Sequence, residues 1–419
     1  MMILVGLVIT LLAVLGVPLF AVIAVSAMWG YMREDIDLSA LAIEIFGIAE
    51  MPILLAIPLF TFAGYLLSEG GAPSRLVRVT QALLGWVPGG LAVIALVACA
   101  FFTAFTGASG VTIIALGALL YPALKEAGYP EHFNLGLVTT SGSLGLLFAP
   151  SLPLILYGIV ARVPVDDLFL AGILPGILMV AILSGWSFWV NRDLRVPISA
   201  FDWREARDAL WAARWEIPLP VIVLGGIYGG VFAVSEAAAV TAAWVMIVEL
   251  LILREVSLQR LPGVMRESMM LVGGILLILG VSLASTNYMI DAGVPQKLFA
   301  IVDSLVSGQA SFLLLLLVFL LILGAILDIF SAIVLVVPLI LPVAERYGID
   351  PVHLGIVFLA AMQLGYLTPP VGLNLFIASY RFEKSITAVY RATFPFLVML
   401  LVAVVIIAYW PALSLALVD

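Results

Sequence analysis

The sequence predicts an all-α, polytopic membrane protein built from two inverted repeats, each with five spans and one re-entrant hairpin. The 419 residues are 64% hydrophobic and 11% charged, with a mean hydropathy of +1.25, whereas soluble chains carry about 25% charged residues. Apolar runs of about 20 residues, the length that spans a bilayer, recur along the chain. In addition, one pattern of residues occurs twice within these runs.

The repeated pattern has a constant offset of 220 residues. Its members are Pro122, Gly128, Leu144, Gly145, Leu147 and Pro150, which recur as Pro342, Gly348, Leu364, Gly365, Leu367 and Pro370. Each copy follows an interrupted apolar stretch and ends in a proline-rich break. Lipid tolerates a broken helix only where protein or a watery cavity pairs the freed backbone groups. Paired broken segments in two halves are typical of the binding site of a secondary transporter.

The first predicted repeat covers residues 1–190. Its five crossings are predicted over residues 3–29, 36–48, 52–67, 132–160 and 168–190. The first run lacks a positive n-region and is too long for a cleaved signal peptide, so we interpret it as a span. The hairpin is predicted at about 90–121, where TGASG interrupts the apolar run. The crossing at about 132–160 is predicted to be a broken helix.

A change of composition separates the repeats. Residues 191–216 contain five arginines and several tryptophans, which predicts an amphipathic linker at the cytoplasmic membrane surface. The second repeat then covers residues 217–419, with a hairpin at about 311–342 and a broken helix at about 353–380. Its other crossings are predicted over residues 217–232, 237–253, 269–290 and 386–410.

The placement of positive charge predicts the orientation. Because five crossings is an odd number, the second repeat must be inverted relative to the first. With a cytoplasmic linker, 15 of the 18 Lys and Arg residues fall on the cytoplasmic side, and only Arg162, Lys297 and Arg346 fall opposite. The positive-inside rule favours this orientation, with both termini outside the cytoplasm. The two hairpins then open from opposite sides, which suits alternating access.

The first hairpin tip, residues 105–112, reads FTGASGVT. Gly107 and Gly110 allow the backbone to turn and to approach an ion closely. Freed carbonyls suit Na⁺, and the N-terminus of a half-helix suits an anion; tight helix packing is the structural alternative for such small residues. The first break, residues 142–153, contains Pro150 and Pro153, which remove amide donors and expose carbonyls.

The second hairpin tip, residues 327–334, reads LDIFSAIV. Asp328 lies in an apolar run, where a carboxylate costs roughly 2.5–3.5 kcal/mol on insertion scales. This favours a functional cation partner, and an ion pair with a distant arginine is the structural alternative. The second break, residues 365–374, brings two prolines, Thr368 and Asn374 into one apolar span. Two opposed tips beside two breaks meet only near the bilayer midplane. There we expect Ser109, Thr112, Ser331 and Asn374 to bind a substrate carboxylate.

Other classes of protein are disfavoured. An intramembrane aspartyl protease needs two facing aspartates, but the position that matches Asp328 is Ala108. A channel would not need inverted halves. The sequence contains no GxxxxGK[ST] motif, so ATP is not the expected energy source. The lone Cys99 excludes an intramolecular disulfide, and we expect a lipid bilayer as partner and no nucleic acid.

At these motifs the chain resembles the large membrane subunit of the TRAP (tripartite ATP-independent periplasmic) transporters, the DctM type. The resemblance covers essentially the whole chain and is clearest in FFTAFTGASG, GSLGLLFAPSLPLILYG, DIFSAIVLVVPLILPV and GYLTPPVGLN. The paired tips and breaks are also similar to those of the wider ion-transporter superfamily of Na⁺-coupled dicarboxylate carriers. The chain departs from the family pattern at GAS in the first tip and at APS in the first break.

The resemblance implies an elevator-type transporter in the bacterial inner membrane that couples uptake of an organic anion to Na⁺. It implies two partners, a periplasmic substrate-binding protein and a small four-helix membrane subunit. It also implies at least two Na⁺ sites. Their residues would be Gly107, Ser109, Gly145 and Pro150 for the first site, and Asp328, Ser331, Thr368 and Pro369 for the second. C4-dicarboxylates, keto acids, sugar acids and sialic acid all remain open as substrates, and so does a stand-alone carrier that needs no partners.

Overall fold

Every regular element that the computed structural model describes is a helix. It describes residues 11–12, 15–86, 90–192 and 201–418. The first half contains α2 (Leu19–Arg33), α3 (Ser39–Ile48), η1 (Pro52–Leu55), α4 (Ala56–Glu69), α5 (Ala72–Leu84), α6 (Gly90–Thr106), α7 (Ser109–Glu126), α8 (Glu131–Ser141), η2 (Leu144–Leu147), α9 (Leu152–Ala161) and α10 (Val165–Val190).

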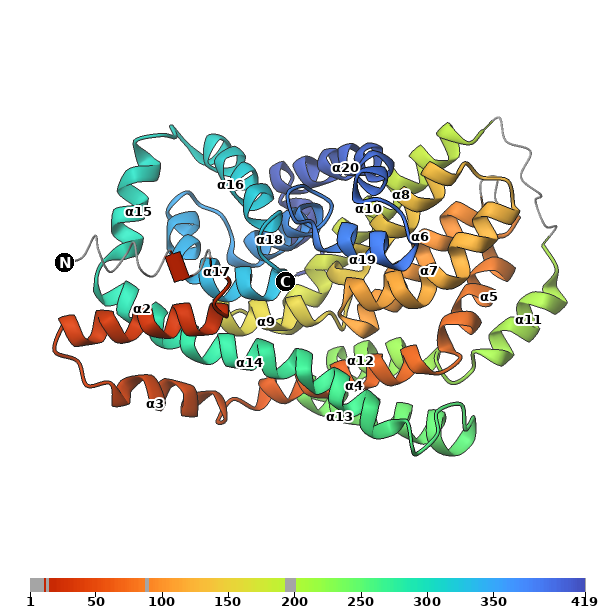
Figure 1. Ribbon diagram of the computed structural model, residues 1–419, viewed down its shortest axis with the longest axis horizontal. Helices are drawn as coiled ribbons and strands as arrows, with labels where there is room; N and C mark the ends of the chain where they lie inside the picture. The colour runs from red at the N-terminus through yellow and green to blue at the C-terminus, as the bar shows by residue number, and fades with distance from the viewer. Residues whose placement is uncertain (1–10, 13–14, 87–89, 193–200, 419) are drawn as a thin grey trace.

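The second half follows the linker helix α11 (Trp203–Ala212). It contains α12 (Pro218–Tyr228), α13 (Val234–Ile247) with a π-helical turn η3 (Val248–Ile252), α14 (Leu261–Asp291), α15 (Val294–Asp303), α16 (Gln309–Gly324), α17 (Ile329–Arg346), α18 (Pro351–Gly365), α19 (Leu373–Arg381), α20 (Ile386–Tyr409) and α21 (Ala412–Leu415). Figure 1 shows α2, α3, α4, α13 and α14 as one long layer with α12 beside it, and α6 to α10 and α16 to α20 above it.

The helices recur at the same offset as the sequence pattern. Helix α7 begins and ends 220 residues before α17, and α8, α9 and α10 begin within one residue of that offset from α18, α19 and α20. Contacts between the halves are reciprocal: α2 packs on α14 and α4 on α13, α7 packs on α19 and α9 on α17, and α8 packs on α20 and α10 on α18. Reciprocal contacts of this kind are those that a two-fold relation between repeats produces.

Local chemistry explains where the helices break. Gly107, with φ +63°, and the extended Ala108 separate α6 from α7, because glycine adopts positive φ without a steric cost. Asp328 separates α16 from α17 by capping the new helix. The described pair α8–η2 and α9 is bent by 43°, and the peptide bonds before Pro150 and Pro370 are both cis.

The structure corrects two predicted spans. Residues 3–29 do not form a single span, because the chain turns at Leu15–Pro18 before α2 begins. This turn contains Gly16, with φ +83°. Residues 3–10 and 13–14 of that prediction lie outside the described residues. The predicted crossing at 36–48 is also wrong in length. Helix α3 has 10 residues, or about 15 Å, half the thickness of the hydrocarbon core.

Instead, α3 and α4 both pack on the 31-residue α14, and together they match its length. Six described helices, or seven with the bent pair, are long and apolar enough to cross a membrane. Shorter apolar helices make up the rest of the predicted crossings. The predicted linker at 191–216 contains α11, whose Ala206 and Ala209 are buried where α11 packs on α5; residues 193–200 lie outside the described part.

Two glycines of the repeated pattern allow the hairpins to approach the broken helices. A methyl group on Gly145 would overlap the carbonyl oxygen of Ala100 in α6 and lie 2.6 Å from the amide nitrogen of Ala104. At the matching position, a methyl group on Gly365 would lie 2.7 Å from the carbonyl oxygen of Gly324 in α16. Backbone packs directly against backbone at both places.

We therefore expect Gly145→Ala to destabilise the protein by at least 2 kcal/mol, roughly the upper part of the range for overpacked sites. The matched control is Gly274→Ala in α14, where nothing lies within 4 Å of the added methyl group, and this change should be neutral or slightly stabilising. Thermal unfolding of the detergent-purified variants measures both. Equal unfolding midpoints for the two variants would show that this close approach does not exist.

Candidate functional site

The two tips meet at one cavity of about 370 Å³, here called the tip cavity. The first tip contributes Gly107–Val111 to its lining, and the second contributes Asp328–Phe330. The remaining lining residues come from α4, α7, α14, the two breaks and α19: Tyr65, Ile114, Leu146, Leu271, Tyr366, Leu373 and Ile377. Segments from both halves of the sequence therefore build a single site.

Asp328 has two roles in this arrangement. Its Oδ1 accepts hydrogen bonds from the backbone amides of Phe330 and Ser331, each at 3.0 Å, and its Oδ2 accepts one from Ser331 Oγ at 2.5 Å. This is the N-cap of α17. The side chain is nevertheless exposed and lines the tip cavity. Among the ion pairs of the described residues, none involves Asp328, so a structural pair with a distant arginine is not seen.

Ser109 connects the first tip to the second break. Its Oγ donates to Asn374 Oδ1 at 2.8 Å, and Asn374 Nδ2 lies 3.5 Å from the Thr139 carbonyl in α8. Ser109 lines the tip cavity, whereas Asn374 is fully buried behind it. The structure therefore brings these two predicted substrate residues together across 265 residues of sequence.

Other predicted residues lie away from the cavity lining. The hydroxyl of Thr112 is 2.7 Å from that of Thr103 in the other arm of the hairpin, and Thr103 also donates to the Gly142 carbonyl at 2.9 Å. Thr368 Oγ1 donates to the Leu364 carbonyl at 2.9 Å. Ser331 is not part of the cavity lining, but its hydroxyl donates to Asp328, which is. Gly145 and Pro150 are buried in the first break, whereas Pro369 is exposed in the second.

Gly107 does line the cavity. A Cβ at this position would lie 2.5 Å from Leu152 Cδ1, so the first tip packs closely against the first break. Among the described residues, no three His, Cys, Asp or Glu side chains gather as metal ligands. A hard cation at the tips would therefore take the Asp328 carboxylate together with hydroxyl and carbonyl oxygens, which are the ligands that such ions prefer. An exposed carboxylate without an ion pair fits that requirement.

Comparison with known proteins identifies the family. The profile described as "Tripartite ATP-independent periplasmic transporter, DctM component" matches residues 3–413. The chain belongs to this family. It is a multi-pass membrane permease of a bacterial TRAP transporter, and its family transports solutes rather than catalysing reactions.

Relatives within the DctM family are named for different substrates. The C4-dicarboxylate TRAP transporter large permease DctM of Pseudomonas aeruginosa is 37% identical, over 90% of this chain and 89% of that protein. The ectoine/5-hydroxyectoine large permease UehC of Ruegeria pomeroyi is 30% identical, over 97% of this chain and 96% of that protein. The isethionate permease DctMQ of Oleidesulfovibrio alaskensis is 32% identical, over 97% of this chain but only 64% of that longer protein.

A solved structure shares the fold. The crystal structure of the Alcanivorax borkumensis YdaH transporter matches with a TM-score of 0.58 and 16% sequence identity, over 89% of this chain and 87% of that one. At this identity the likeness supports the arrangement of helices alone. It agrees with the predicted all-helical fold.

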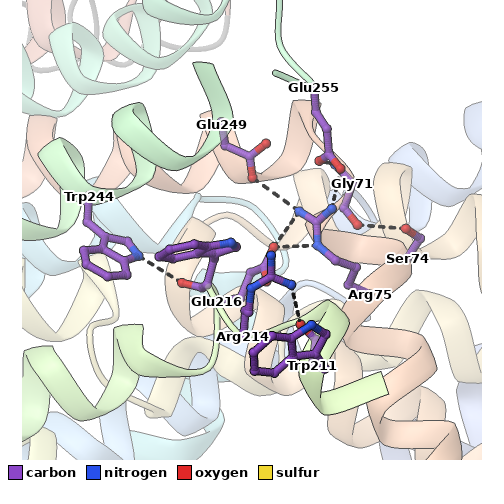
Figure 2. Close-up of polar contacts among 10 residues, drawn as sticks. Gly71, Ser74, Arg75, Trp211, Arg214, Glu216, Trp244, Glu249 and Glu255 are labelled. Carbon is purple, nitrogen blue, oxygen red and sulfur yellow. Dashed lines mark hydrogen bonds and ion pairs between the residues drawn. The ribbon is translucent and has the colours of Figure 1, made fainter. Parts of the chain in front are cut away.

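Outside the tip cavity, this DctM chain contains a charged cluster that sequence reasoning missed (Figure 2). Arg75 of α5 forms ion pairs with Glu216 at 2.5 Å, Glu255 at 2.5 Å and Glu249 at 3.6 Å. Only 13% of the Arg75 side chain is exposed, and Glu249 is fully buried. Glu249 lies inside the apolar run of residues 237–253, where a carboxylate is unexpected, but its partner Arg75 lies in the other half of the sequence.

The cluster fastens α5 to the second half of the chain. Besides the ion pairs, the amide of Gly71, at the start of α5, donates to Glu255 Oε2 at 2.6 Å. Burial raises the pKa of Glu255, but the hydrogen bonds from Arg75 and from Gly71 outweigh it and hold the pKa below its usual value. The stability that this carboxylate contributes is full above its ordinary pKa and is lost as the pH falls through the lowered value.

We expect Arg75→Met to destabilise the protein by roughly 3–5 kcal/mol, because it leaves three carboxylates without their shared cation. The matched control is Arg78→Met on the same helix. Arg78 pairs with Glu205, and both side chains are 50% exposed, so the change should cost less than about 1 kcal/mol. Thermal unfolding midpoints of the two variants in detergent measure the difference. Equal losses of stability in Arg75→Met and Arg78→Met would contradict a structural role for the cluster.

Proposed function

We propose that this permease imports an organic anion in symport with Na⁺, by an elevator movement of its tips and broken helices. The observation that supports this most is the tip cavity, which both halves line and which an unpaired carboxylate faces. A lone Asp328 cannot attract an anion, so a cation must come first. Na⁺ at Asp328 would neutralise the carboxylate and leave positive potential from the helix N-termini for the substrate.

The recurrence of the helices supports the inverted-repeat arrangement. Two repeats with an odd number of crossings place their hairpins on opposite faces of the membrane, so that each tip reaches the same site from its own side. Rigid-body movement of the tips and breaks against the long layer of α2, α4, α13 and α14 then exposes the site to one face at a time. The expected second Na⁺ site lies between Gly107 and Ser109 of the first tip and the carbonyls near Gly145 and Pro150.

Membership of a TRAP system implies two partners, a small membrane subunit and a periplasmic binding protein, and we propose the bacterial inner membrane as the location. One relative is named as a DctMQ protein, which supports a small Q-type subunit as a partner of this permease. A stand-alone carrier is the alternative. Co-purification of the chain with its small subunit distinguishes the two.

The first test concerns the charge of Asp328. Asparagine is as good an N-cap as aspartate, so Asp328→Asn should keep α17 capped while it removes the negative charge that attracts the cation. We expect at least a tenfold loss of apparent Na⁺ affinity in uptake by proteoliposomes that contain the complete system, since a charge-assisted contact is worth about 1.5–3 kcal/mol.

The matched control is Asp350→Asn, the N-cap of α18, whose carboxylate accepts from Val352 and His353 amides and does not line the cavity. It should leave the Na⁺ dependence unchanged. An Asp328→Asn variant with wild-type Na⁺ affinity would contradict the proposal that the Asp328 carboxylate binds Na⁺.

The second test concerns topology. On a Cys99→Ser background, single cysteines in place of Arg204 and Arg260 should react with a membrane-impermeant thiol reagent only from the cytoplasmic face, because the positive charges gather there. Cysteines added at the two termini should react only from the periplasmic face. Labelling of position 204 from the periplasm would overturn the inverted arrangement.

A further inference from the structure

The charge of the tip cavity restricts what it can bind. Among its described lining residues, none is Lys, Arg or His, and Asp328 is the one acidic side chain. Apart from helix termini, the positive charge available to a substrate is therefore that of bound Na⁺. With the two proposed Na⁺ ions and the negative charge of Asp328, the site carries a net charge of about +1, which balances one carboxylate. A second carboxylate on the same molecule would be left uncompensated away from water, which is costly.

The polar side chains at the cavity are few, and part of their hydrogen-bonding capacity is used within the protein. Ser109 Oγ donates to Asn374, Ser331 Oγ donates to Asp328, and the Tyr366 hydroxyl accepts from the amide of Ile329 at 2.9 Å. The described lining side chains offer three hydroxyls, those of Tyr65, Ser109 and Tyr366, which are fewer than the several hydroxyls of a sugar acid would need as partners. A polyhydroxylated substrate would give up its hydrogen bonds to water without replacing them.

Apolar side chains cover most of the remaining lining. They come from α7, the first break, α14, α17 and α19: Ile114, Leu146, Leu271, Phe330, Leu373 and Ile377. Ile377 lies directly on the first tip, since a Cβ on Gly110 would be 2.7 Å from Ile377 Cδ1. These side chains surround the space beside the tips with hydrocarbon, which favours a substrate that buries an apolar body there.

We infer that the substrate is a monovalent anion with an apolar body, an aliphatic or aromatic monocarboxylate that fits a cavity of about 370 Å³. This rests on the proposed Na⁺-coupled function and narrows it. The carboxylate lies beside Na⁺ at the tips, and the hydrocarbon part lies against Ile377, Phe330 and their neighbours. Dicarboxylates and sugar acids are disfavoured, for reasons of charge and of hydration respectively.

The test uses the permease purified with its small membrane subunit, and measures the rise of the unfolding midpoint with added ligand in NaCl and in choline chloride. The probes are 4-methylpentanoate, succinate, gluconate and the neutral 4-methylpentanamide. In NaCl, we expect 4-methylpentanoate to raise the unfolding midpoint at a concentration at least tenfold lower than succinate or gluconate needs for the same rise. Even one well-buried methylene group changes affinity about tenfold. The amide should have no Na⁺-dependent effect.

Variants then place the apolar body. Ile377→Ala should weaken 4-methylpentanoate at least tenfold, while Leu314→Ala, in α16 and away from the cavity lining, should not change it. Stronger Na⁺-dependent binding of succinate or gluconate, or an unchanged affinity in Ile377→Ala, would overturn this substrate class and leave the proposed function standing. The absence of any Na⁺-dependent effect from all three anions would overturn the proposed function itself.

Discussion

Backbone groups inside a bilayer must find partners within the protein, and the interrupted helices of this chain depend on how that requirement is met. At the second tip, the Asp328 carboxylate accepts hydrogen bonds from the amides of Phe330 and Ser331, and the Tyr366 hydroxyl accepts one from the amide of Ile329. At the second break, the amides of Val371 and Gly372 donate to the Ala325 carbonyl at the end of α16. In the first hairpin, the hydroxyl of Thr103 in α6 donates to the Gly142 carbonyl of the first break. Each hairpin is thus bonded to the broken helix of its own half.

These pairings explain why the tips and breaks act as units. A tip that satisfies the backbone of its neighbouring break cannot move away without leaving donors or acceptors unpaired in lipid, at a cost of several kcal/mol for each group. Movement of tip and break together avoids this cost. The joints of the movement must then lie outside each pair of tip and break. Helix α5 connects α4 of the long layer to the first hairpin, and one of its ends is held by the Arg75 cluster.

The sequence predicted the breaks well because their causes are local. Glycine at 107, proline at 150 and 370, and the carboxylate of Asp328 alter backbone geometry within a few residues, so they can be recognised without a fold. It could not tell which hydroxyls face the cavity. Ser109 and Thr112 lie in the same helical turn, yet Ser109 points across to Asn374 while Thr112 points to Thr103 in its own hairpin. Nor could it find the partners of Arg75, since pairing across 141 and 180 residues depends on the packing of whole helices.

The central claim is that one site between the tips opens to the two faces of the membrane in turn. Ala108 lines the cavity. A single cysteine at this position, in a Cys99→Ser background, reports directly on which face of the membrane the site opens to. In vesicles of each orientation, an impermeant thiol reagent should reach position 108 from both faces, and saturating Na⁺ with a transported anion should slow labelling from both. Labelling from one face only, under every combination of Na⁺ and anion, would contradict the account.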